Sequence, residues 1–400
     1  MSQTLQSNSA PPVVPTGAPT VAAPPTSGLR RRWALLAPVL KFRGFLAVSR
    51  LAGVLPLRVS YTLAILVGDC IYYLSHEHSS NAVSNMRRVL GPRAGERAAR
   101  RAARNSFRNY CKTLADFIRF PHMPPAEMQR RVAHSYGLEV MDQALAQGKG
   151  VLAITAHLGN WDFAGAFMGR RGTPLYALAD KFEPPQLDAL VIETRRRNGV
   201  NIIKMEAAAM RTIFAALKRN EVVILLTDRP MPDDGIAVQF FGETAWLPSG
   251  PAAIALKTGA PIIIGCCWRE PGDIQFSGGI EPLVEYKPHL TGNKQADTRM
   301  ITQMIATALE GLIRHDPDQW YMFRPMWPRP ITAAEARRAR RAARRQTLRH
   351  RAGGLVQRSR LTRLRRRLPS DSPADLRGTA AGISVDPPDV EAWATGEREP

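Results

Sequence analysis

The amino-acid sequence predicts an α/β protein with a mixed, largely parallel sheet flanked by helices, preceded by a helical N-terminal part. Three apolar runs of the kind found in strands buried on both faces lie at residues 151–155 (VLAIT), 222–227 (VVILLT) and 261–268 (PIIIGCCW). Segments of helical character lie at 161–169, 205–219 and 250–258. This alternation is typical of a parallel sheet with crossover helices. Residues 35–150 show no comparable strand and are expected to be helical.

The start of this helical part is apolar but repeatedly interrupted. Charged residues break the stretch 33–75 at Lys41, Arg43, Arg50, Arg58 and Asp69. Its longest uninterrupted run, from Val59 to Gly68, has only about half of the roughly 20 residues that a membrane-spanning helix needs. Apolar stretches that alternate with cations favour a segment lying on, or shallowly embedded in, a membrane. A pair of ordinary amphipathic core helices is the alternative.

A second membrane candidate is the clearest helix of the sequence, at residues 97–120. An apolar stripe recurs with helical period at Phe107, Tyr110, Cys111, Leu114, Phe117 and Ile118. Arginines and one lysine dominate the rest of the helix. A basic amphipathic helix can lie on anionic lipid, but the same pattern suits a core helix with a solvated basic face. Both interpretations remain open from the sequence.

The charge of the chain is unevenly distributed. The 400 residues contain 55 Lys and Arg against 34 Asp and Glu, a net charge of +21, yet residues 337–367 alone hold fourteen arginines and no acid. We therefore divide the chain into five parts. These are a Pro-rich leader (1–32), a helical membrane-associating part (33–150), an α/β core (151–330), an Arg-rich segment (331–368) and a disordered acidic end (369–400). The charge indicates an anionic partner: a membrane surface, a nucleic acid or an acidic ligand.

Cysteine content and the N-terminus bear on the compartment. Four cysteines in a chain of this length, without a CxxC pair or a dense Cys/His cluster, do not indicate a disulfide framework or a metal site. Residues 1–29 carry no charge and are Pro-rich, unlike a secretory signal, which has a basic start and an apolar core. We expect a reduced, cytosol-facing protein that needs no metal or other cofactor.

The segment from Ala156 to Asp162 (AHLGNWD) is the candidate site because it directly follows a buried strand. Ligands in open α/β sheets gather beyond the carboxyl ends of strands. If Gly159 makes a turn and Asn160 caps the next helix, Asp162 lies in the first helical turn and can reach back to a ring nitrogen of His157. The imidazole could then take a proton from a hydroxyl. Alternatively, Asp162 only favours the helix N-terminus and His157 is an ordinary strand-end residue.

These residues also carry a resemblance. The segment His157–Asp162 resembles the HxxxxD motif of the lysophospholipid acyltransferase superfamily, and more narrowly that of the bacterial lauroyl/myristoyl acyltransferases of lipid A biosynthesis and the related phosphatidylinositol mannoside acyltransferases. The likeness covers about residues 35–330 and continues in order through RRRNG (195–199), DRP (228–230), FFG (240–242), PSGPAA (248–253), KTGAP (257–261) and PDQWY (317–321). Members of that family usually begin with a membrane-spanning segment that is clearer than residues 33–75 of this chain.

The resemblance implies a membrane-associated enzyme on the cytoplasmic face of the inner membrane. It would move an acyl chain from a thioester of acyl carrier protein or coenzyme A to a hydroxyl of a glycolipid or lysophospholipid. His157 would be the general base and Asp162 its orienting partner. Substrate-binding roles would fall to Arg229, to Gly159 and Asn160, and to the helix start at Ser249 and Gly250. The structural alternatives are a salt bridge of Arg229 with Asp228, Asp233 or Asp234, and a simple helix cap at Ser249.

Three functional hypotheses follow. The first is acyl transfer to a lipid A precursor or, as a variant, to a mannosylated phosphatidylinositol. The second is a non-catalytic nucleic-acid-binding protein that uses the Arg-rich segment. This hypothesis is disfavoured because the segment lacks interleaved aromatic residues. The third is a catalytically inactive lipid-binding relative, against which the intact HxxxxD motif argues.

Overall fold

The computed structural model describes residues 53–327, apart from 173, 233, 283 and 284, and also residues 43, 44, 46, 47, 49 and 50. The predicted leader at 1–32, the Arg-rich segment at 331–368 and the acidic end at 369–400 lie outside the described residues. The domain boundaries drawn from the sequence therefore stay predictions.

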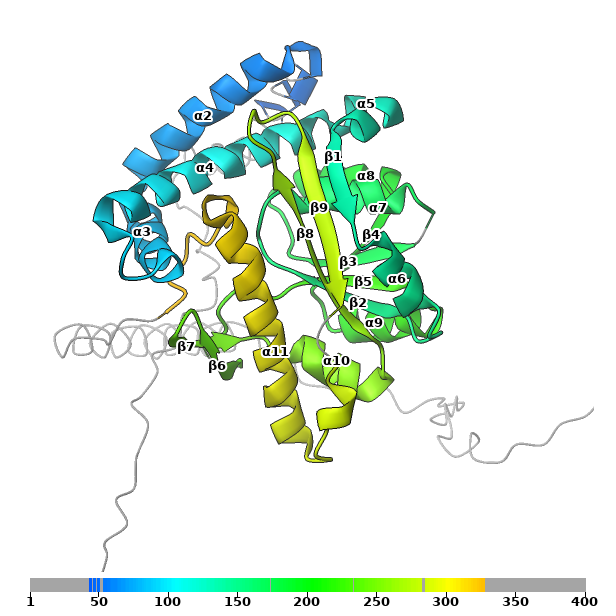
Figure 1. Cartoon of the computed structure of the whole chain (residues 1–400). Helices are drawn as coiled ribbons and strands as arrows, with labels where there is room; N and C mark the ends of the chain where they lie inside the picture. Colours follow the sequence, from blue (N-terminus) through cyan, green and yellow to red (C-terminus); the bar gives the residue numbers. More distant parts are fainter. Residues whose placement is uncertain are drawn as a thin grey trace, which may run out of the picture. The chain divides into compact units, whose positions relative to one another are not determined.

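A seven-stranded sheet forms the centre of the described chain (Figure 1). Its order is β1-β9-β8-β2-β5-β3-β4, and the strands are β1 (Val132–Tyr136), β2 (Val151–Thr155), β3 (Leu175–Ala179), β4 (Val200–Lys204), β5 (Val222–Leu226), β8 (Ile262–Arg269) and β9 (Phe276–Pro282). Strands β8, β2, β5, β3 and β4 run parallel to their neighbours, whereas β9 is antiparallel to β8 and β1 follows β9. The predicted mixed, largely parallel sheet is confirmed.

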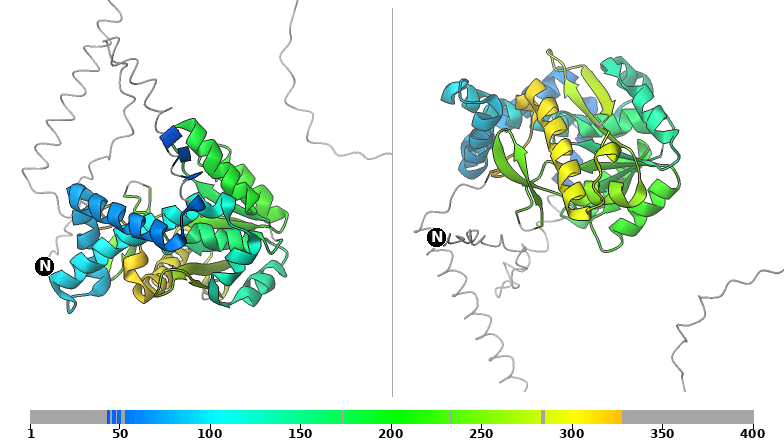
Figure 2. Two further views of the ribbon diagram at one scale, coloured as in Figure 1. Left: turned by 90° about the horizontal axis from the view of Figure 1, so that it is seen from above. Right: turned by 60° about the horizontal axis from the view of Figure 1, so that its bottom comes forward.

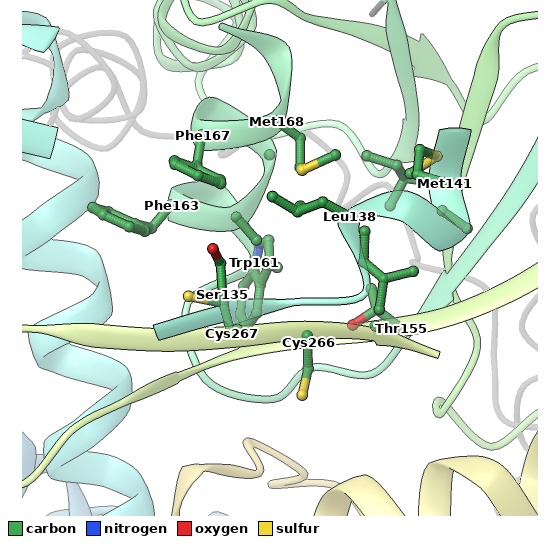
Figure 3. Close-up of a pocket in the computed structure, with 18 of the residues that line it drawn as sticks. Ser135, Leu138, Met141, Thr155, Trp161, Phe163, Phe167, Met168, Cys266 and Cys267 are labelled. Atoms are coloured by element: carbon green, nitrogen blue, oxygen red, sulfur yellow. The ribbon is translucent and has the colours of Figure 1, made fainter. Parts of the chain in front are cut away.

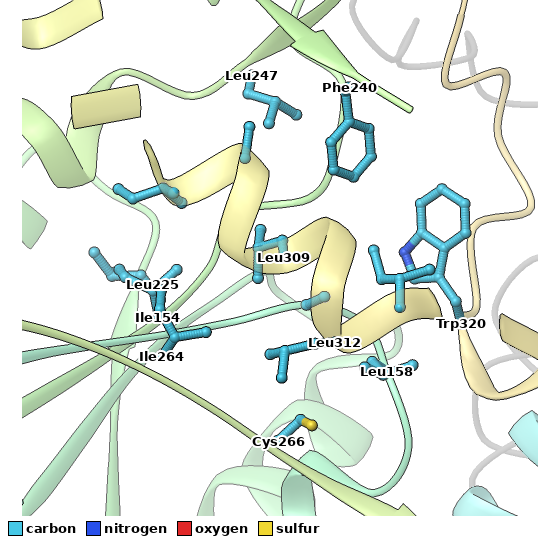
Figure 4. Packing of buried hydrophobic residues seen from close by; sticks show 14 of the residues in the cluster. Ile154, Leu158, Leu225, Phe240, Leu247, Ile264, Cys266, Leu309, Leu312 and Trp320 are labelled. Atoms are coloured by element: carbon cyan, nitrogen blue, oxygen red, sulfur yellow. The ribbon is translucent and has the colours of Figure 1, made fainter. Parts of the chain in front are cut away.

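Both faces of the central strands are buried, which explains their continuous apolar sequences. In β2, Leu152 and Ile154 belong to one hydrophobic cluster, and Val151 with Ala153 belongs to another on the opposite face. Successive side chains of a strand point to opposite faces, so an apolar residue at every position needs cover on both sides. Each such aliphatic side chain contributes about 1.5–3 kcal/mol of transfer free energy on burial. Figure 4 shows Ile154 facing Leu309 and Leu312 of the long helix α11.

Two groups of helices supply this cover (Figure 1). One face of the sheet carries α6 (Leu138–Leu145), α7 (Trp161–Gly169) and α8 (Pro185–Arg197). The other face carries α9 (Ala209–Lys218), α10 (Gly250–Thr258) and α11 (Lys294–His315). The helices predicted at 161–169 and 250–258 are confirmed to the residue, and that predicted at 205–219 is confirmed within a shorter range. Short 3₁₀ turns occupy Phe120–His122, Lys287–His289 and Pro317–Gln319.

The N-terminal part comprises α2 (Leu57–Leu74), α3 (His76–Leu90), α4 (Gly95–Arg119) and α5 (Pro125–Arg130). Helix α4 is the predicted basic amphipathic helix, and its apolar stripe packs inward through residues such as Phe107 and Cys111. Helix α2 lies alongside α4 (Figure 2). The two backbones approach closely at Gly68, where a Cβ atom would meet the Arg108 Cα at 2.8 Å. Glycine is therefore required at this helix crossing.

Helix α2 presents a largely apolar outer surface. Its buried residues are Ser60, Tyr61, Ala64 and Gly68, whereas large side chains on the other side are exposed, namely Val59, Leu63, Leu66, Val67, Ile71, Tyr73 and Leu74. With 18 residues, α2 is long and apolar enough to cross a membrane by length and composition alone. That test is also passed by many helices of soluble proteins. The outward direction of the apolar side chains is the more informative property of α2.

The stretch expected to be wholly helical contains a strand, which is a correction to the sequence analysis. Strand β1 pairs in parallel with β9 at the end of the sheet. Its sequence, VAHSY, has a half-exposed edge position and lacks the continuous apolar character of the central strands. A separate hairpin joins β6 (Ile236–Phe240) to β7 (Glu243–Leu247). Its two turn residues, Phe241 and Gly242, both have positive φ, as a tight two-residue hairpin turn requires.

Candidate active site

The segment His157–Asn160 connects β2 to α7 at the carboxyl edge of the parallel strands. Gly159 has φ +62°, and a Cβ atom there would lie 1.9 Å from the Cys267 carbonyl oxygen, so that only glycine fits this turn. The buried Asn160 side chain accepts a hydrogen bond from the Phe163 amide at 2.9 Å and thereby caps α7. The turn and the cap predicted from the sequence are both confirmed.

The backbone of this segment is held at every residue. Leu158 forms an antiparallel bridge with Trp320, and the Gly159 amide donates to the Gln319 carbonyl at 2.9 Å. The Tyr321 amide donates to the His157 carbonyl, and the Asn160 amide donates to the Cys267 carbonyl, both at 2.8 Å. We call residues 157–160 the catalytic loop. Its hydrogen bonds to Gln319 and Tyr321 show that the PDQWY segment at 317–321, although distant in the sequence, holds the catalytic loop in place.

His157 is paired with Asp228, which follows β5. The ring Nδ1 lies 2.7 Å from Asp228 Oδ1, and the His157 amide donates to Oδ2 at 2.9 Å. The indole N–H of Trp320 donates to the same Oδ2 at 2.8 Å. Asp228 is fully buried, whereas His157 remains partly exposed. With Nδ1–H donating to the carboxylate, Nε2 is the ring nitrogen that can accept a proton.

The charge of Asp228 is maintained despite its burial. Burial by itself would raise the pKa of this carboxyl, but His157 and the hydrogen bonds from His157 and Trp320 outweigh that effect and hold the pKa below its usual range. A carboxylate in this position fixes the tautomer of the imidazole and stabilises the imidazolium that forms when Nε2 takes a proton. The geometry is that of a His–Asp general base.

Asp162, the partner expected from the sequence, has a different contact. Its two oxygens accept from Nε and Nη2 of Arg195 at 2.7 and 3.2 Å. The expected hydrogen bond between His157 and Asp162 is therefore not formed. Asp228 accepts from Nδ1 of His157, while Asp162, in the first turn of α7, joins α7 to α8 through Arg195. Both members of the Asp162–Arg195 pair are largely buried. Arg195 also lies over the Phe117 ring, with its Cζ 5.5 Å from the centroid.

The three remaining predicted site residues have looser positions. Arg229 follows Asp228 and is about two-fifths exposed, and its guanidinium contacts Asp180 at 2.6 Å. The structural alternative of a salt bridge thus holds, but with Asp180, which follows β3. Ser249 and Gly250 begin α10, and the Ser249 side chain makes no capping hydrogen bond. No hydrogen bond between described residues joins Ser249 or Gly250 to the catalytic loop.

A row of aromatic rings begins at His157. Trp161 packs edge-on against the imidazole with centroids 5.6 Å apart, and Tyr321 packs against Trp161 at 5.8 Å. Tyr110, from α4, lies 5.3 Å from Tyr321. Trp161 also lines an apolar cavity.

That cavity lies between the sheet and helices α6 and α7 (Figure 3). Its lining is almost entirely apolar and includes Trp161, Phe167 and Met168 of α7 together with Leu138 and Met141 of α6. Along the sheet it extends from the carboxyl ends of the parallel strands, at Thr155, to their amino ends, at Leu175 and Val222. Four residue steps of a strand correspond to roughly 13 Å. The cavity therefore has room for a long apolar ligand, and Trp161 connects it to the surroundings of His157.

Metal ligation is not indicated within the part of the chain that the structure describes. No group of three or more His, Cys, Asp or Glu side chains in that part is arranged to hold a metal ion. The chemistry that the described residues support directly is proton transfer by His157.

An α/β fold with a His–Asp pair at the strand ends can activate a hydroxyl, and an apolar cavity lined by the neighbouring Trp161 can hold an acyl chain, as an acyl-transferring enzyme requires. The family comparison agrees: residues 32–329 match the model of the bacterial lipid A biosynthesis acyltransferases, so the chain belongs to that acyltransferase family. It is also similar to two proteins named phosphatidylinositol mannoside acyltransferase. That of Mycobacterium tuberculosis (strain CDC 1551 / Oshkosh) is 29% identical over 274 residues, 67% of this chain and 82% of the relative. That of Mycolicibacterium smegmatis is 29% identical over 211 residues, 51% of this chain and 66% of the relative.

Proposed function

We propose that this acyltransferase moves a fatty acyl chain from an acyl carrier protein or coenzyme A thioester to a hydroxyl of a glycolipid. The observation that carries the proposal is the contact of His157 with the buried Asp228 at 2.7 Å, beside Trp161, which lines the apolar cavity. A hydroxyl is a poor nucleophile until a base removes its proton. The pair supplies such a base, and the thioester is already activated, so no covalent acyl-enzyme is needed.

The reaction begins when Nε2 of His157 takes the proton of the acceptor hydroxyl. The oxygen then attacks the thioester carbonyl and forms the new C–O bond. The C–S bond breaks as the tetrahedral intermediate collapses, and the imidazolium returns the proton to the leaving thiolate. The products are one ester and one free thiol, and His157 ends in its starting form. Asp228 stays ionised throughout and stabilises the imidazolium.

The apolar cavity is the proposed site of the acyl chain. Trp161 borders both the imidazole and the cavity, so a chain lying along α7 would present its thioester carbonyl to His157. Burial of each methylene contributes about 0.8 kcal/mol to binding. Together with a bound acyl chain, the Trp161 ring would shield the thioester from water, which would otherwise compete with the acceptor.

Arg229 is the proposed phosphate contact. Its ion pair with Asp180 is half-exposed on both sides, and such a pair contributes little to stability and can exchange partners. A phosphate of the donor or of the acceptor lipid would offer a bidentate, negatively charged alternative. For Ser249 and Gly250, the free amides at the start of α10 remain the argument for anion binding.

The acceptor class has two candidates. A lipid A precursor is favoured by the family match, and a mannosylated phosphatidylinositol is favoured by the similarity to the mycobacterial enzymes. Both are anionic glycolipids with a sugar hydroxyl and a membrane-embedded apolar part. The proposal is therefore a glycolipid acyltransferase, and the identity of the sugar is the point that an experiment must decide.

Such an acceptor requires a membrane-bound enzyme, and α2 supplies the contact. Its outer side exposes Leu63, Leu66, Val67 and Ile71 to the surroundings, while its other side packs on α4. A helix packed along one side and apolar along the other suits a position in the plane of the membrane surface. We place the enzyme on the cytoplasmic face of the inner membrane, peripheral or shallowly embedded, where anionic lipid attracts nearby basic residues.

The non-catalytic alternatives are less well supported. A nucleic-acid-binding function would rely on the Arg-rich segment at 331–368, which lies outside the described residues. Neither that function nor passive lipid binding gives a role to a buried carboxylate that orients a histidine.

The test is an assay of acyl transfer with the purified full chain. Vesicles would contain either a lipid A precursor or a mannosylated phosphatidylinositol, with acyl carrier protein or coenzyme A thioesters as donors. We expect one of the two lipids to gain one acyl chain by mass spectrometry, and His157→Ala to abolish the gain. Asp297→Asn is the control, because it changes a buried carboxylate whose hydrogen bonds among the described residues come from Thr291 and Gly292. A His157→Ala variant with the wild-type rate would contradict the proposal.

A further inference from the structure

A buried ionic cluster connects helix α2 to the catalytic loop. Its centre is Asp116, a fully buried residue of α4. Oδ1 of Asp116 accepts from the Tyr61 hydroxyl at 2.6 Å and from Arg131 Nη2 at 2.8 Å. Oδ2 accepts from Arg269 Nη2 at 2.5 Å and from the Asn160 side-chain amide at 3.1 Å. Four donors from four separate parts of the chain thus meet at one carboxylate.

The contact with Asn160 ties this cluster to catalysis. Asn160 is the last residue of the catalytic loop, and its side chain uses Oδ1 to cap α7 and Nδ2 to reach Asp116. The other hydrogen bonds of the loop, apart from the Asp228 contact and one from the Thr113 hydroxyl, are made to backbone groups. Asp116 is therefore the ionised group that sets the orientation of the Asn160 side chain, three residues from His157.

The contact with Tyr61 ties the same cluster to α2. Most large apolar side chains of α2 point outward, so buried polar contacts attach it to α4 in addition to the packing of Ala64 and Gly68. Three such attachments join α2 to α4 among the described residues. Tyr61 donates to Asp116, Asp69 accepts paired hydrogen bonds from Arg104 and Arg108 at 2.7 to 2.8 Å, and Arg119 donates to the Ser60 hydroxyl at 3.5 Å. Of these three attachments, the one through Tyr61 includes the partner of Asn160.

The cost of burial indicates that this cluster has a demanding role. Two guanidinium groups and one carboxylate are removed from water, and Nη1 of Arg131 and Nε of Arg269 have no hydrogen-bond partner among the described residues. Buried ion clusters of this kind are often no more stable than apolar packing of the same volume. A fixed geometry at Asp116 is what such a cluster provides in return.

We propose that Asp116 and Tyr61 are positioning residues for His157, so that the seating of α2 on α4 sets the geometry of the catalytic loop. The proposal rests on the proposed acyl transfer, and it adds to it a connection between the lipid-facing helix and the base. Neither residue touches the reacting atoms. Both act through Asn160, whose cap fixes where α7 begins and therefore where the loop ends.

Tyr61→Phe is the most informative variant because it removes one hydroxyl and leaves the ring and the outer surface of α2 in place. We expect kcat to fall roughly tenfold or more, because a small displacement of a catalytic group is costly, while the KM for the thioester changes little. Binding to anionic vesicles should be unchanged. Asp69→Asn is the matched control: it weakens a different attachment of α2 to α4 and should leave kcat within about twofold for a soluble, short-chain acceptor.

Hydrogen exchange gives a second measurement that does not depend on activity. Tyr61→Phe and Asp116→Asn should both speed amide exchange at Asn160 and Phe163 by roughly tenfold or more, whereas Asp69→Asn should not. If Asp116→Asn fails to fold, Tyr61→Phe decides alone. Wild-type kcat and wild-type exchange in Tyr61→Phe would overturn the proposal, as would equal effects of Tyr61→Phe and Asp69→Asn. If the wild-type chain transfers no acyl group, the proposed function fails, and exchange still decides the positioning role.

Discussion

The Nδ1 atom of His157 lies 2.7 Å from Oδ1 of Asp228, although the two residues are 71 positions apart in the sequence. The register of the sheet brings them together. Thr155, the last residue of β2, pairs with Leu226, the last residue of β5, and His157 and Asp228 each lie two residues beyond their strand. Adjacent parallel strands in register place such positions side by side. The pairing of His157 with Asp228 follows from the topology of the sheet.

The first prediction concerns Asp162, which contacts Arg195 and not His157. If the two residues act as one unit, Asp162→Asn and Arg195→Met should each lower kcat/KM by a similar factor, about 10- to 100-fold. The double variant should be no worse than the more severe single variant, because the second change removes nothing that is still intact. Steady-state kinetics of the three variants measure this. Factors that multiply in the double variant would show that Asp162 acts independently of Arg195.

The second prediction concerns the length of the acyl chain. Met141 lines the cavity from α6 and belongs to the hydrophobic cluster near the amino ends of the strands, away from Trp161. Met141→Trp should shift the preference toward shorter chains by about tenfold in kcat/KM, because pocket contacts with a few methylenes have that value. A mixture of thioesters of increasing length, read by mass spectrometry, measures the shift.

The control for this experiment is Met86→Phe, a change in a buried methionine of α3 that does not line the cavity. It should leave the preference unchanged. Products of wild-type chain length from a folded Met141→Trp variant would show that the acyl chain lies elsewhere.

The third prediction concerns the membrane contact of α2. Cys70 is exposed on this helix beside Leu66 and Ile71, whereas the other three cysteines are buried. Burial raises the pKa of Cys111 to about 11 and that of Cys267 to about 12, and it raises the pKa of Cys266 well above its usual value. The thiolate is the reactive form, so a maleimide should label Cys70 selectively in the folded chain.

Anionic vesicles should slow this labelling by roughly tenfold or more, because a membrane-buried side chain is shielded from a water-soluble reagent. Cys70→Ser should remove the labelling in the absence of vesicles and thus identify the site. A labelling rate that is the same with and without vesicles would exclude α2 as the membrane contact.

The fold was largely predictable, and the exceptions share a cause. Central strands such as β2 and β5 need apolar residues at every position, and that signal is strong in a single sequence. Strand β1 lies at the end of the sheet and its last three residues are exposed, and β9 carries two glycines, Gly278 and Gly279, that dilute its apolar character. Such strands form because they pair with neighbouring strands, and their own sequences predict them only weakly.

The site was predictable in part for a related reason. The Gly159 turn and the Asn160 cap depend on local backbone chemistry, and both were recognised. The partner of His157 is decided by which strands are neighbours in the sheet, and the spacing of residues along the sequence holds no information about that. Spacing alone therefore favours Asp162, which is close to His157 in the sequence. The signal for Asp228 is the DRP sequence, which begins two residues after the strand at 222–226. It identifies the partner of His157 only when β2 and β5 are known to be adjacent and in register.

The most direct test of the central claim is the turnover of Asp228→Asn. An amide at this position can no longer fix the tautomer of His157 or stabilise the imidazolium, so we expect kcat to fall about 10³-fold or more, with KM for both substrates within a few-fold of wild type. Circular dichroism would establish that the variant is folded, and Asp297→Asn would serve as the buried-carboxylate control. A folded Asp228→Asn variant with the turnover of the wild-type enzyme would contradict the account.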